Sequence, residues 1–235
     1  MRLLPARVAA LLAAALTAAL LPAARAADRP ILVELFTSQG CSSCPPAEAV
    51  LLDIAKGRGN VLALGFHVDY WDRLGWKDPF SSPAATERQR RYASVMRLDQ
   101  VYTPQMVVDG RRELIGSDGP AAAAAITAAN AAAPAPVPLR LTREGEGLAV
   151  TIGAGRGAGT AWLVGFDPQR ETPIRRGENA GRTILQANVV RSFESVAEWR
   201  GQEVALRRAM PPGERAALFL QAPDGRILGV TLLGG

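Results

Sequence analysis

The sequence predicts an α/β domain at residues 29–133, with a mixed central sheet flanked by helices, followed by an antiparallel β domain of the sandwich type at residues 139–235. A strand, helix and strand pattern over residues 31–66 indicates a crossover between parallel strands. The proline-rich segment 134–138 is typical of a stiff, extended linker. Beyond this linker the hydrophobic pattern changes to short alternating segments, which favours antiparallel strands.

The first domain contains segments with the hydrophobic patterns of regular elements. They are strands at 31–36 and 61–66, helices at 45–56, about 84–97 and 118–132, and a hairpin at 105–115. Asp109-Gly110 lies between two apolar runs and is a strong signal for the turn of that hairpin. Ser117 or Asp118 is expected to cap the last helix. The expected order is therefore strand, helix, strand, helix, hairpin, helix.

The second domain is predicted from short apolar segments separated by turn signals such as Pro223-Asp224-Gly225. The segments are 139–142, 148–152, 161–166, 184–190, 204–206, 216–221 and 227–233. Their length and spacing favour a small antiparallel sandwich.

Residues 1–26 have the pattern of an export signal. Arg2 and Arg7 give a positive start, the run 8–21 is apolar, and 24–26 is a small-x-small cleavage site. The apolar run is shorter than the ~20 residues that span a bilayer. We therefore expect a soluble mature protein in the periplasm or secreted, with an uncleaved anchor as the alternative.

The charge of the chain argues against a nucleic-acid partner. The signal contains Arg2, Arg7 and Arg25 and no acidic residue, so its removal lowers the formal net charge from +5 to +2. The densest basic cluster, 88–91, falls on an expected helix, where a solvated face explains it better.

The only two cysteines of the chain are Cys41 and Cys44, placed between an expected strand and an expected helix. A helix start offers free amides and positive potential, which favour the thiolate form of a cysteine. As a staple the pair would close a loop of only two residues and stabilise little. Ser42 and Ser43 carry no charge, so we expect a moderately lowered pKa for Cys41. Because Pro46 disfavours helical geometry at Pro45, regular helix within the segment 45–56 is expected to begin only after the two prolines.

The strand at 31–36, the pair Cys41 and Cys44, and Thr103-Pro104 before a hairpin together resemble the thioredoxin superfamily. The resemblance covers residues 29–132. It implies that Cys41 is an exposed nucleophile, that Cys44 resolves mixed disulfides, that the two form a disulfide, and that Pro104 follows a cis bond facing them.

Glu34 has two interpretations. The superfamily holds a buried acid beneath the second cysteine, and Glu34 falls close to that place, one residue off. As the alternative, it marks a solvated strand end.

A closer resemblance is to an exported bacterial family with a thioredoxin-like domain that is catalogued only as a domain of unknown function. It rests on ELFTSQGCSSCPP at 34–46, HVDYWD at 67–72 and YTPQ at 102–105. Residues 177–179 and 188–191 also match this family's pattern, without a role that we can assign.

The single histidine, His67, follows the second strand beside acidic residues. Together with Cys41 and Cys44 it could bind copper, although a lone histidine is more often a structural hydrogen-bonding residue. The aromatic loop at 67–82 either shapes a substrate groove or folds onto the sheet as extra core.

The sequence thus predicts an exported thiol-disulfide oxidoreductase that acts on thiols or disulfides of other proteins, with a membrane redox partner as a further candidate and without a cofactor or metal. The alternatives are a copper chaperone using Cys41, Cys44 and His67, or a thioredoxin-like binding module without catalysis. The direction of the redox reaction does not follow from the sequence.

Overall fold

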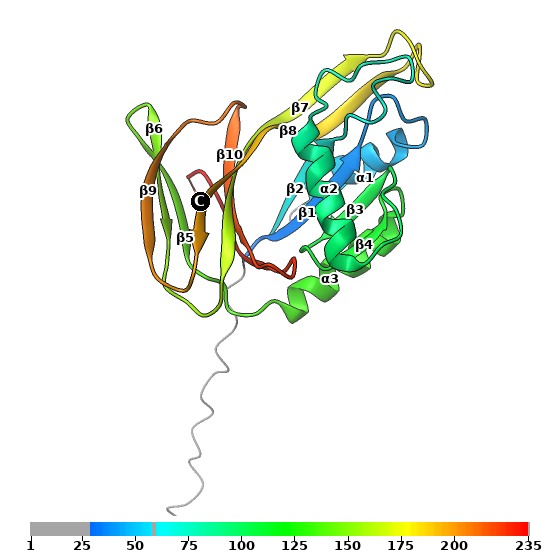
Figure 1. Cartoon of the computed structure of the whole chain (residues 1–235). Coiled ribbons are helices and arrows are strands. Elements are labelled where there is room, and N and C mark those ends of the chain that lie inside the picture. Colours follow the sequence, from blue (N-terminus) through cyan, green and yellow to red (C-terminus); the bar gives the residue numbers. More distant parts are fainter. Residues whose placement is uncertain (1–28, 58–59, 235) are drawn as a thin grey trace, which may run out of the picture.

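The computed structural model describes residues 29–57 and 60–234 (Figure 1). The predicted export signal, residues 1–26, lies outside the described residues. In the described part of the chain, no helix has the length and apolar character needed to cross a membrane.

The first half of the chain follows the predicted order of elements. They are β1 (Ile31–Thr37), α1 (Pro45–Lys56), β2 (Val61–His67), α2 (Pro83–Met96), β3 (Gln105–Val108), β4 (Arg112–Ile115) and α3 (Gly119–Ala132). Strands β1 and β2 are parallel, so the predicted crossover through α1 is confirmed. Strand β3 pairs antiparallel with β1, and β4 pairs antiparallel with β3, which makes this part of the sheet mixed.

Two local predictions in this half are confirmed. Asp109 and Gly110 have φ values of 52° and 67°, the left-handed backbone that a tight hairpin turn requires. Asp118, one of the two expected caps, accepts a hydrogen bond of 2.9 Å from the amide of Ala121 at the start of α3.

Helix α1 begins at Pro45, against our expectation that the two prolines would delay it. Cys44 is the residue before the first turn, and the prolines occupy the first two helical positions. These positions have no intrahelical partner for an amide, so a missing N–H costs little there. The carbonyl oxygen of Cys44 accepts hydrogen bonds from the amides of Ala47 (2.9 Å) and Glu48 (3.1 Å). These first-turn bonds outweigh the preference that Pro46 imposes on Pro45.

Strands after the linker divide between two sheets. They are β5 (Leu139–Glu144), β6 (Gly147–Ile152), β7 (Gly159–Pro173), β8 (Thr183–Trp199), β9 (Val204–Ala209), β10 (Arg215–Gln221) and β11 (Ile227–Leu232). Strands β5, β6 and β9 form a small antiparallel sheet. The others join β1 to β4 in one sheet of order β11-β10-β7-β8-β2-β1-β3-β4. The protein is therefore a mixed α/β protein with a large mixed sheet and a smaller antiparallel sheet.

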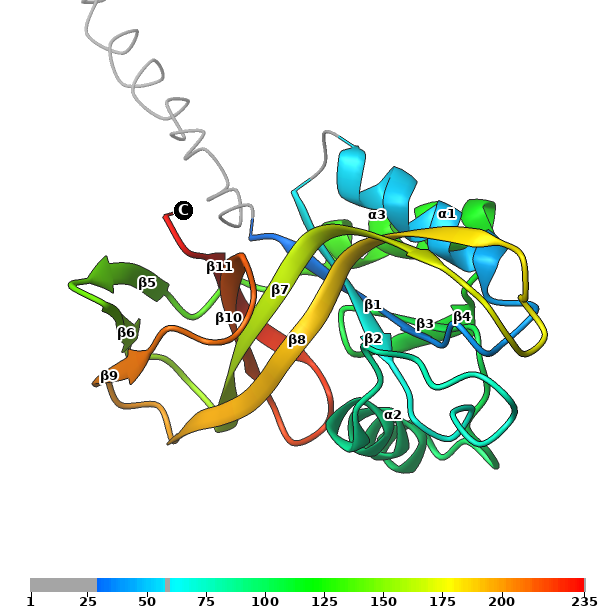
Figure 2. The same cartoon turned by 90° about the horizontal axis from the view of Figure 1, so that it is seen from above.

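The large sheet is continuous because β8 runs parallel to β2, with Gly65 opposite Val189. A Cβ on Gly65 would lie 3.2 Å from the carbonyl oxygen of Ala187, so the absence of a side chain helps β8 to approach. Strands β7 and β8 lie side by side across the whole molecule (Figure 2) and extend far beyond their apolar centres. We had expected the strands after the linker to form a domain of their own, because the proline-rich segment 134–138 is typical of a domain boundary.

Three apolar clusters fill the structure. One lies between the two sheets and contains Leu163 and Trp199, which gives this part the packing of a sandwich. Because successive side chains of a strand point to opposite faces, β1 supplies both of the others. Phe36 faces α2, whereas Leu35 faces α1 and α3. Figure 2 shows α2 on one side of the sheet and the other two helices on the opposite side.

Candidate functional site

Cys41 and Cys44 form a disulfide at the amino end of α1, with their Cα atoms 5.4 Å apart. Both residues are buried, with relative exposures of 0% and 1%, whereas Ser42 and Ser43 between them are exposed. The resemblance implied an exposed Cys41, and in this respect the expectation is wrong. A distant part of the chain contacts the turn that carries both cysteines.

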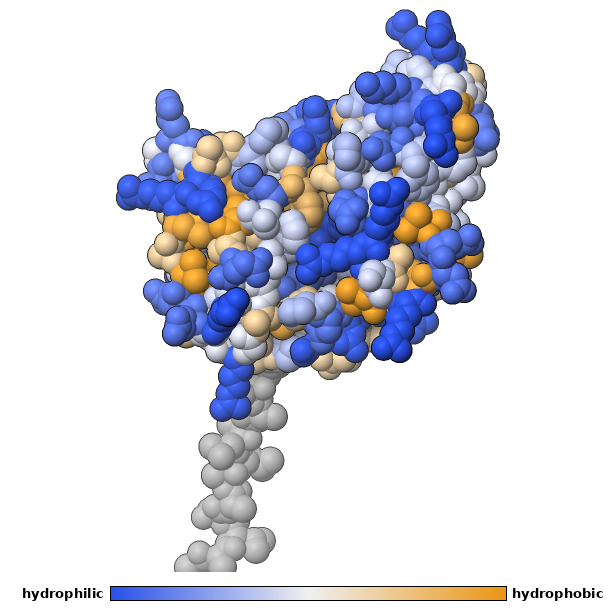
Figure 3. All heavy atoms as spheres, viewed as in Figure 1, coloured by the Kyte–Doolittle hydropathy of each residue, from blue (hydrophilic) through white to orange (hydrophobic). Residues whose placement is uncertain are grey.

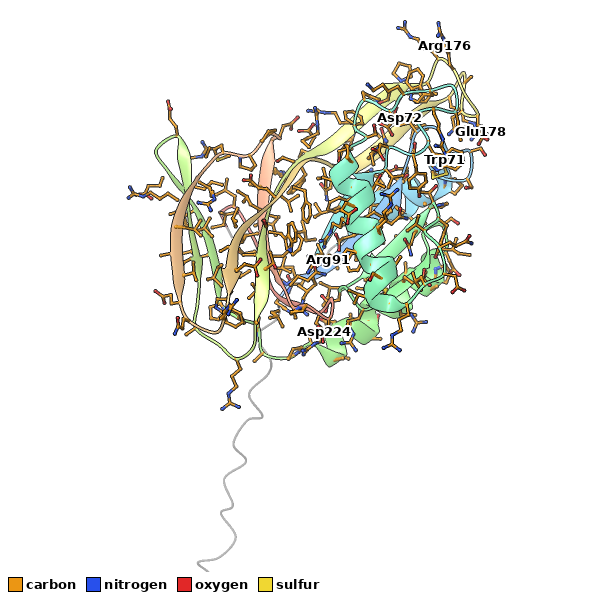
Figure 4. All side chains as sticks on the ribbon, in the orientation of Figure 1. Trp71, Asp72, Arg91, Arg176, Glu178 and Asp224 are labelled. Carbon is orange, nitrogen blue, oxygen red and sulfur yellow. A yellow bond between two sulfur atoms is a disulfide. The ribbon has the colours of Figure 1, made fainter. Side chains whose placement is uncertain are left out.

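The segment between β7 and β8, residues 174–182, is hydrogen-bonded to the turn that carries the cysteine pair, and we call it the cover. Asn179, itself fully buried, donates hydrogen bonds to the carbonyl oxygens of Gln39 (2.9 Å) and Cys41 (2.8 Å). The carboxylate of Glu178 accepts a hydrogen bond of 3.1 Å from the amide of Ser42. These bonds fix the cover against the backbone of the turn, whose two serines remain exposed. Figure 4 shows Glu178 at the far end of the molecule, close to Trp71.

A buried polar network lies at the carboxyl ends of β1 and β2, close to this turn. His67 Nδ1 lies 2.6 Å from a carboxylate oxygen of Asp78, and its Nε2 lies 3.2 Å from the amide nitrogen of Gln186 on β8. Asp78 also accepts a hydrogen bond of 2.8 Å from the backbone amide of Gln39, whose side chain donates 2.9 Å to Gln186. The network therefore ties the segment before Cys41 to the strand that follows the cover.

Charge in this network is arranged around His67. Burial alone would lower the pKa of His67, but the Asp78 carboxylate overcomes burial and raises it. Burial likewise opposes ionisation of Asp78, yet His67 and two backbone amides lower the pKa of Asp78. Each of the two groups thereby stabilises the charged form of the other.

Glu48 is a second buried carboxyl group, one helical turn after Cys44 on α1. Its Oε1 accepts 2.9 Å from the Thr37 hydroxyl and lies 4.0 Å from His67 Nε2. Its Oε2 is buried without a hydrogen-bond partner among the described residues. Burial raises the pKa of Glu48, and His67 and Thr37 offset this only in part. Glu48 is therefore inclined to hold a proton, unlike Asp78.

Glu34 is fully buried and is neither a solvated strand end nor a neighbour of α1. It forms an ion pair with Arg88 on α2, in which Arg88 Nη2 donates 2.9 Å to Glu34 Oε2, and it accepts a hydrogen bond from the Tyr92 hydroxyl. Glu34 alternates with Leu35 along β1, so it lies on the face of the sheet opposite the cysteines' helix.

The Thr103-Pro104 peptide bond is cis. A Cβ placed on Gly116 would lie 3.2 Å from both the Pro104 Cβ and the Ala47 Cβ, so the proline lies beside the first turn of α1. The Thr103 hydroxyl accepts 2.8 Å from the indole of Trp71.

The aromatic loop is partly folded onto the site. The Trp76 indole donates 2.9 Å to the Gln39 side chain, and Phe80 packs edge-on to His67 with ring centres 5.6 Å apart. Its half-buried aromatic rings thus support the polar network more than they form a groove.

The described residues show no set of side chains placed to bind copper. Within residues 29–57 and 60–234, no group of three or more His, Cys, Asp or Glu side chains is arranged to hold a metal ion. The two nitrogens of His67 are directed to Asp78 and Gln186.

Sequence reasoning missed Glu48, Asp78, Asn179 and Gln186 as parts of the site. Asn179 belongs to the segment 177–179 that we had noted without a role, and its position over Cys41 now supplies one. The others are single polar residues in apolar or mixed surroundings, whose burial is decided by distant strands.

The fold and the site define a mixed α/β protein with a covered Cys-x-x-Cys disulfide at a helix start. The chain belongs to a family described as a protein of unknown function (DUF1223), whose model matches residues 32–221. Among solved structures, it is similar to the crystal structure of protein AGR_C_4864 from Agrobacterium tumefaciens, with 30% identity, a TM-score of 0.75, and coverage of 87% of this chain and 94% of that one.

A more distant likeness is to HBP35 of Porphyromonas gingivalis, with 15% identity, a TM-score of 0.59, and coverage of 87% of this chain and 74% of that one. At this identity the likeness concerns the fold alone. None of the curated proteins matches the chain.

Proposed function

We propose that this protein is an exported thiol-disulfide oxidoreductase that acts on thiols or disulfides of other proteins through Cys41 and Cys44. The observation that carries the proposal is a disulfide of two-residue spacing at a helix start, formed by the only cysteines of the chain. Such a ring is too small to stabilise the fold greatly, so its value lies in its chemistry. The export signal that we predict at residues 1–26 supports an oxidising compartment.

A thioredoxin-like arrangement of residues 29–132 is part of the proposal. Support comes from the order of β1, α1, β2, α2, β3, β4 and α3, with the cysteines between β1 and α1. The cis bond before Pro104, a residue that packs near the first turn of α1, supports the same arrangement.

The reaction balances as two successive exchanges. A partner thiolate attacks Cys41 Sγ, a mixed disulfide forms, and Cys44 leaves as a thiolate. A second partner thiolate then attacks the partner's sulfur and releases Cys41 as a thiolate. The partner loses two electrons and the protein gains them; the same steps in reverse reduce a partner disulfide. Cysteine thiolates released in this way take up protons, and Glu48, one turn from Cys44, is the buried carboxyl group that we assign to that transfer in place of Glu34.

Exchange requires that the cover move, because an incoming sulfur needs a free path to Cys41. In the closed state described here, Cys41 has no exposed surface. The cover is held by a few hydrogen bonds of Asn179 and Glu178, each worth about 0.5–1.5 kcal/mol, up to ~3 kcal/mol where a group is charged. The free energy needed to open the cover is therefore modest, and the binding of a partner can offset it.

The complete burial of both sulfurs also favours a second candidate, a binding module whose disulfide is only structural. The two functions differ in turnover. As an oxidoreductase, the protein should catalyse reduction of insulin or reactivation of a scrambled substrate, and Cys41→Ser should abolish this. Cys44→Ser should trap mixed disulfides that mass spectrometry identifies, with the double variant C41S/C44S as the control. If the wild type shows no turnover and Cys44→Ser traps no partner, the binding module is the correct function.

A further inference from the structure

The end of the molecule around the disulfide carries a basic patch. It consists of Arg73 and Lys77 from the aromatic loop and Arg175 and Arg176 from the cover, all four of them exposed. Figure 3 shows hydrophilic side chains gathered at the tip where β7 and β8 end, and Figure 4 shows Arg176 projecting outward from it.

The two basic segments adjoin one another. A Cβ on Gly75 would lie 3.5 Å from the Cα of Gly177, and a Cβ on Gly177 would lie 3.1 Å from the Cβ of Trp76. The cover then continues directly to Glu178, which accepts the hydrogen bond from Ser42. The basic patch and the cysteine turn are thus parts of one continuous surface.

The basic side chains of this patch have no ion-pair partners among the described residues. Among residues 29–57 and 60–234, none of the four basic side chains forms an ion pair within 4.0 Å. The nearby acids Glu178 and Asp72 keep their negative charge, and they accept hydrogen bonds from the Ser42 amide and from the Ser81 hydroxyl and Asp78 amide. The four basic side chains outnumber these two acids. A net positive field therefore faces whatever approaches the disulfide.

An apolar side chain lies within the same patch. Leu74, between Arg73 and Gly75, is 53% exposed, one of two large hydrophobic residues that are exposed to this degree in the described part of the chain. Leu74 thus offers one apolar contact beside the basic side chains.

We propose that the basic patch of Arg73, Lys77, Arg175 and Arg176 docks an acidic segment next to the reactive cysteine of the partner protein, with Leu74 as the apolar contact. This proposal rests on the proposed function and names the chemistry of its partner. Half of the patch belongs to the cover, so a partner that binds the patch also contacts the segment that is hydrogen-bonded to the cysteine turn. Docking and access to the disulfide are in this way coupled.

The test compares two matched peptides with a single cysteine, one flanked by aspartates and one by lysines, in stoichiometric exchange with the oxidised protein. At low ionic strength the acidic peptide should react about tenfold faster, within the range that electrostatic steering gives, and the difference should shrink at ~0.15 M salt. The variant R175E/R176E should reverse the order of the two peptides. The matched control R140E/R143E changes two exposed arginines of β5 in the small sheet, alters the net charge equally and should preserve the order.

Binding of the same peptides with serine in place of cysteine, followed by fluorescence anisotropy, separates docking from chemistry. If no peptide exchanges but the acidic serine peptide binds and R175E/R176E abolishes this binding, the proposed function fails and the docking proposal holds. If exchange occurs at equal rates for both peptides in every variant, the docking proposal is overturned and the proposed function stands. Binding to vesicles of anionic phospholipid without any preference between the peptides would assign the patch to a membrane surface and would also overturn it.

Discussion

The side-chain amide of Asn179 donates a hydrogen bond of 2.8 Å to the carbonyl oxygen of Cys41. A second bond from the same amide reaches the carbonyl oxygen of Gln39 at 2.9 Å, and Arg182 donates 3.1 Å to the Asn179 side-chain oxygen. Both N–H groups and the oxygen of the Asn179 side-chain amide therefore have hydrogen-bond partners, as a buried amide requires. Asn179 is thus the residue by which the cover is fastened to the cysteine turn.

Replacing Asn179 with Ala should make the disulfide more reactive. The two buried hydrogen bonds to the turn are lost, and a cost of ~1.4 kcal/mol to the closed state raises the open population about tenfold. We expect the rate of reduction by a small thiol, measured under pseudo-first-order conditions, to rise by about that factor. Asn130→Ala, an exposed asparagine on α3, is the matched control and should leave the rate unchanged. Equal rates for Asn179→Ala and the wild type would mean that the cover does not limit access.

The strand, helix and strand around the cysteines could be predicted because the pattern of neighbouring residues determines each element. The run 31–36, the stripe on 45–56 and the Asp109-Gly110 turn specify their own conformations within a few residues. The disulfide at the start of α1 follows from that order.

The cover over Cys41 could not be predicted in this way. Asn179 lies 138 positions from Cys41, and the two meet only because β8 pairs with β2 through the Gly65–Val189 contact. The role of Glu34 was missed for a related reason. Alternation along β1 puts Glu34 on the face of α2, but its partner Arg88 looked like a solvated member of a basic cluster on a helix.

Glu48→Gln should slow thiol-disulfide exchange, because the buried acid that we assign to proton transfer is removed while the contact with Thr37 can be kept. General acid-base catalysis contributes at least about 100-fold where it operates fully, so a loss of about tenfold or more is expected. The paired variant E34Q/R88Q serves as the control, since it leaves no unpaired buried charge and acts on the opposite face of the sheet. Its exchange rate, measured with the same peptide, should stay within about twofold of the wild type. If the control slows exchange and Glu48→Gln does not, Glu34 is the acid after all.

Asp78→Asn should destabilise the protein in a pH-dependent manner. The pKa of His67 is raised by Asp78, so the ion pair contributes fully below the ordinary histidine value of 6.5 and is lost as the pH rises through the raised pKa. At about pH 5.5 the variant loses this ion pair and burial then opposes protonation of His67, so we expect a cost of about 3–5 kcal/mol. At about pH 9 His67 is closer to neutral in both proteins, and the difference should shrink. Urea unfolding at the two pH values measures this, and a constant difference between them would mean that His67 is not charged in the folded protein.

Arg88→Gln should cost about 3–5 kcal/mol of unfolding free energy, because it leaves the carboxylate of Glu34 buried without its ion-pair partner. The guanidinium also lies 4.7 Å from the ring centre of Phe193, so part of the loss is packing. The double variant E34Q/R88Q loses the same packing but buries no unpaired charge, and it should therefore be more stable than Arg88→Gln alone by about 2 kcal/mol. Urea unfolding of the wild type, both single variants and the double variant closes the cycle. The double variant could instead lose as much unfolding free energy as the two single variants lose together. Glu34 and Arg88 would then contribute independently, and their ion pair would not be the contact that fixes α2 on β1.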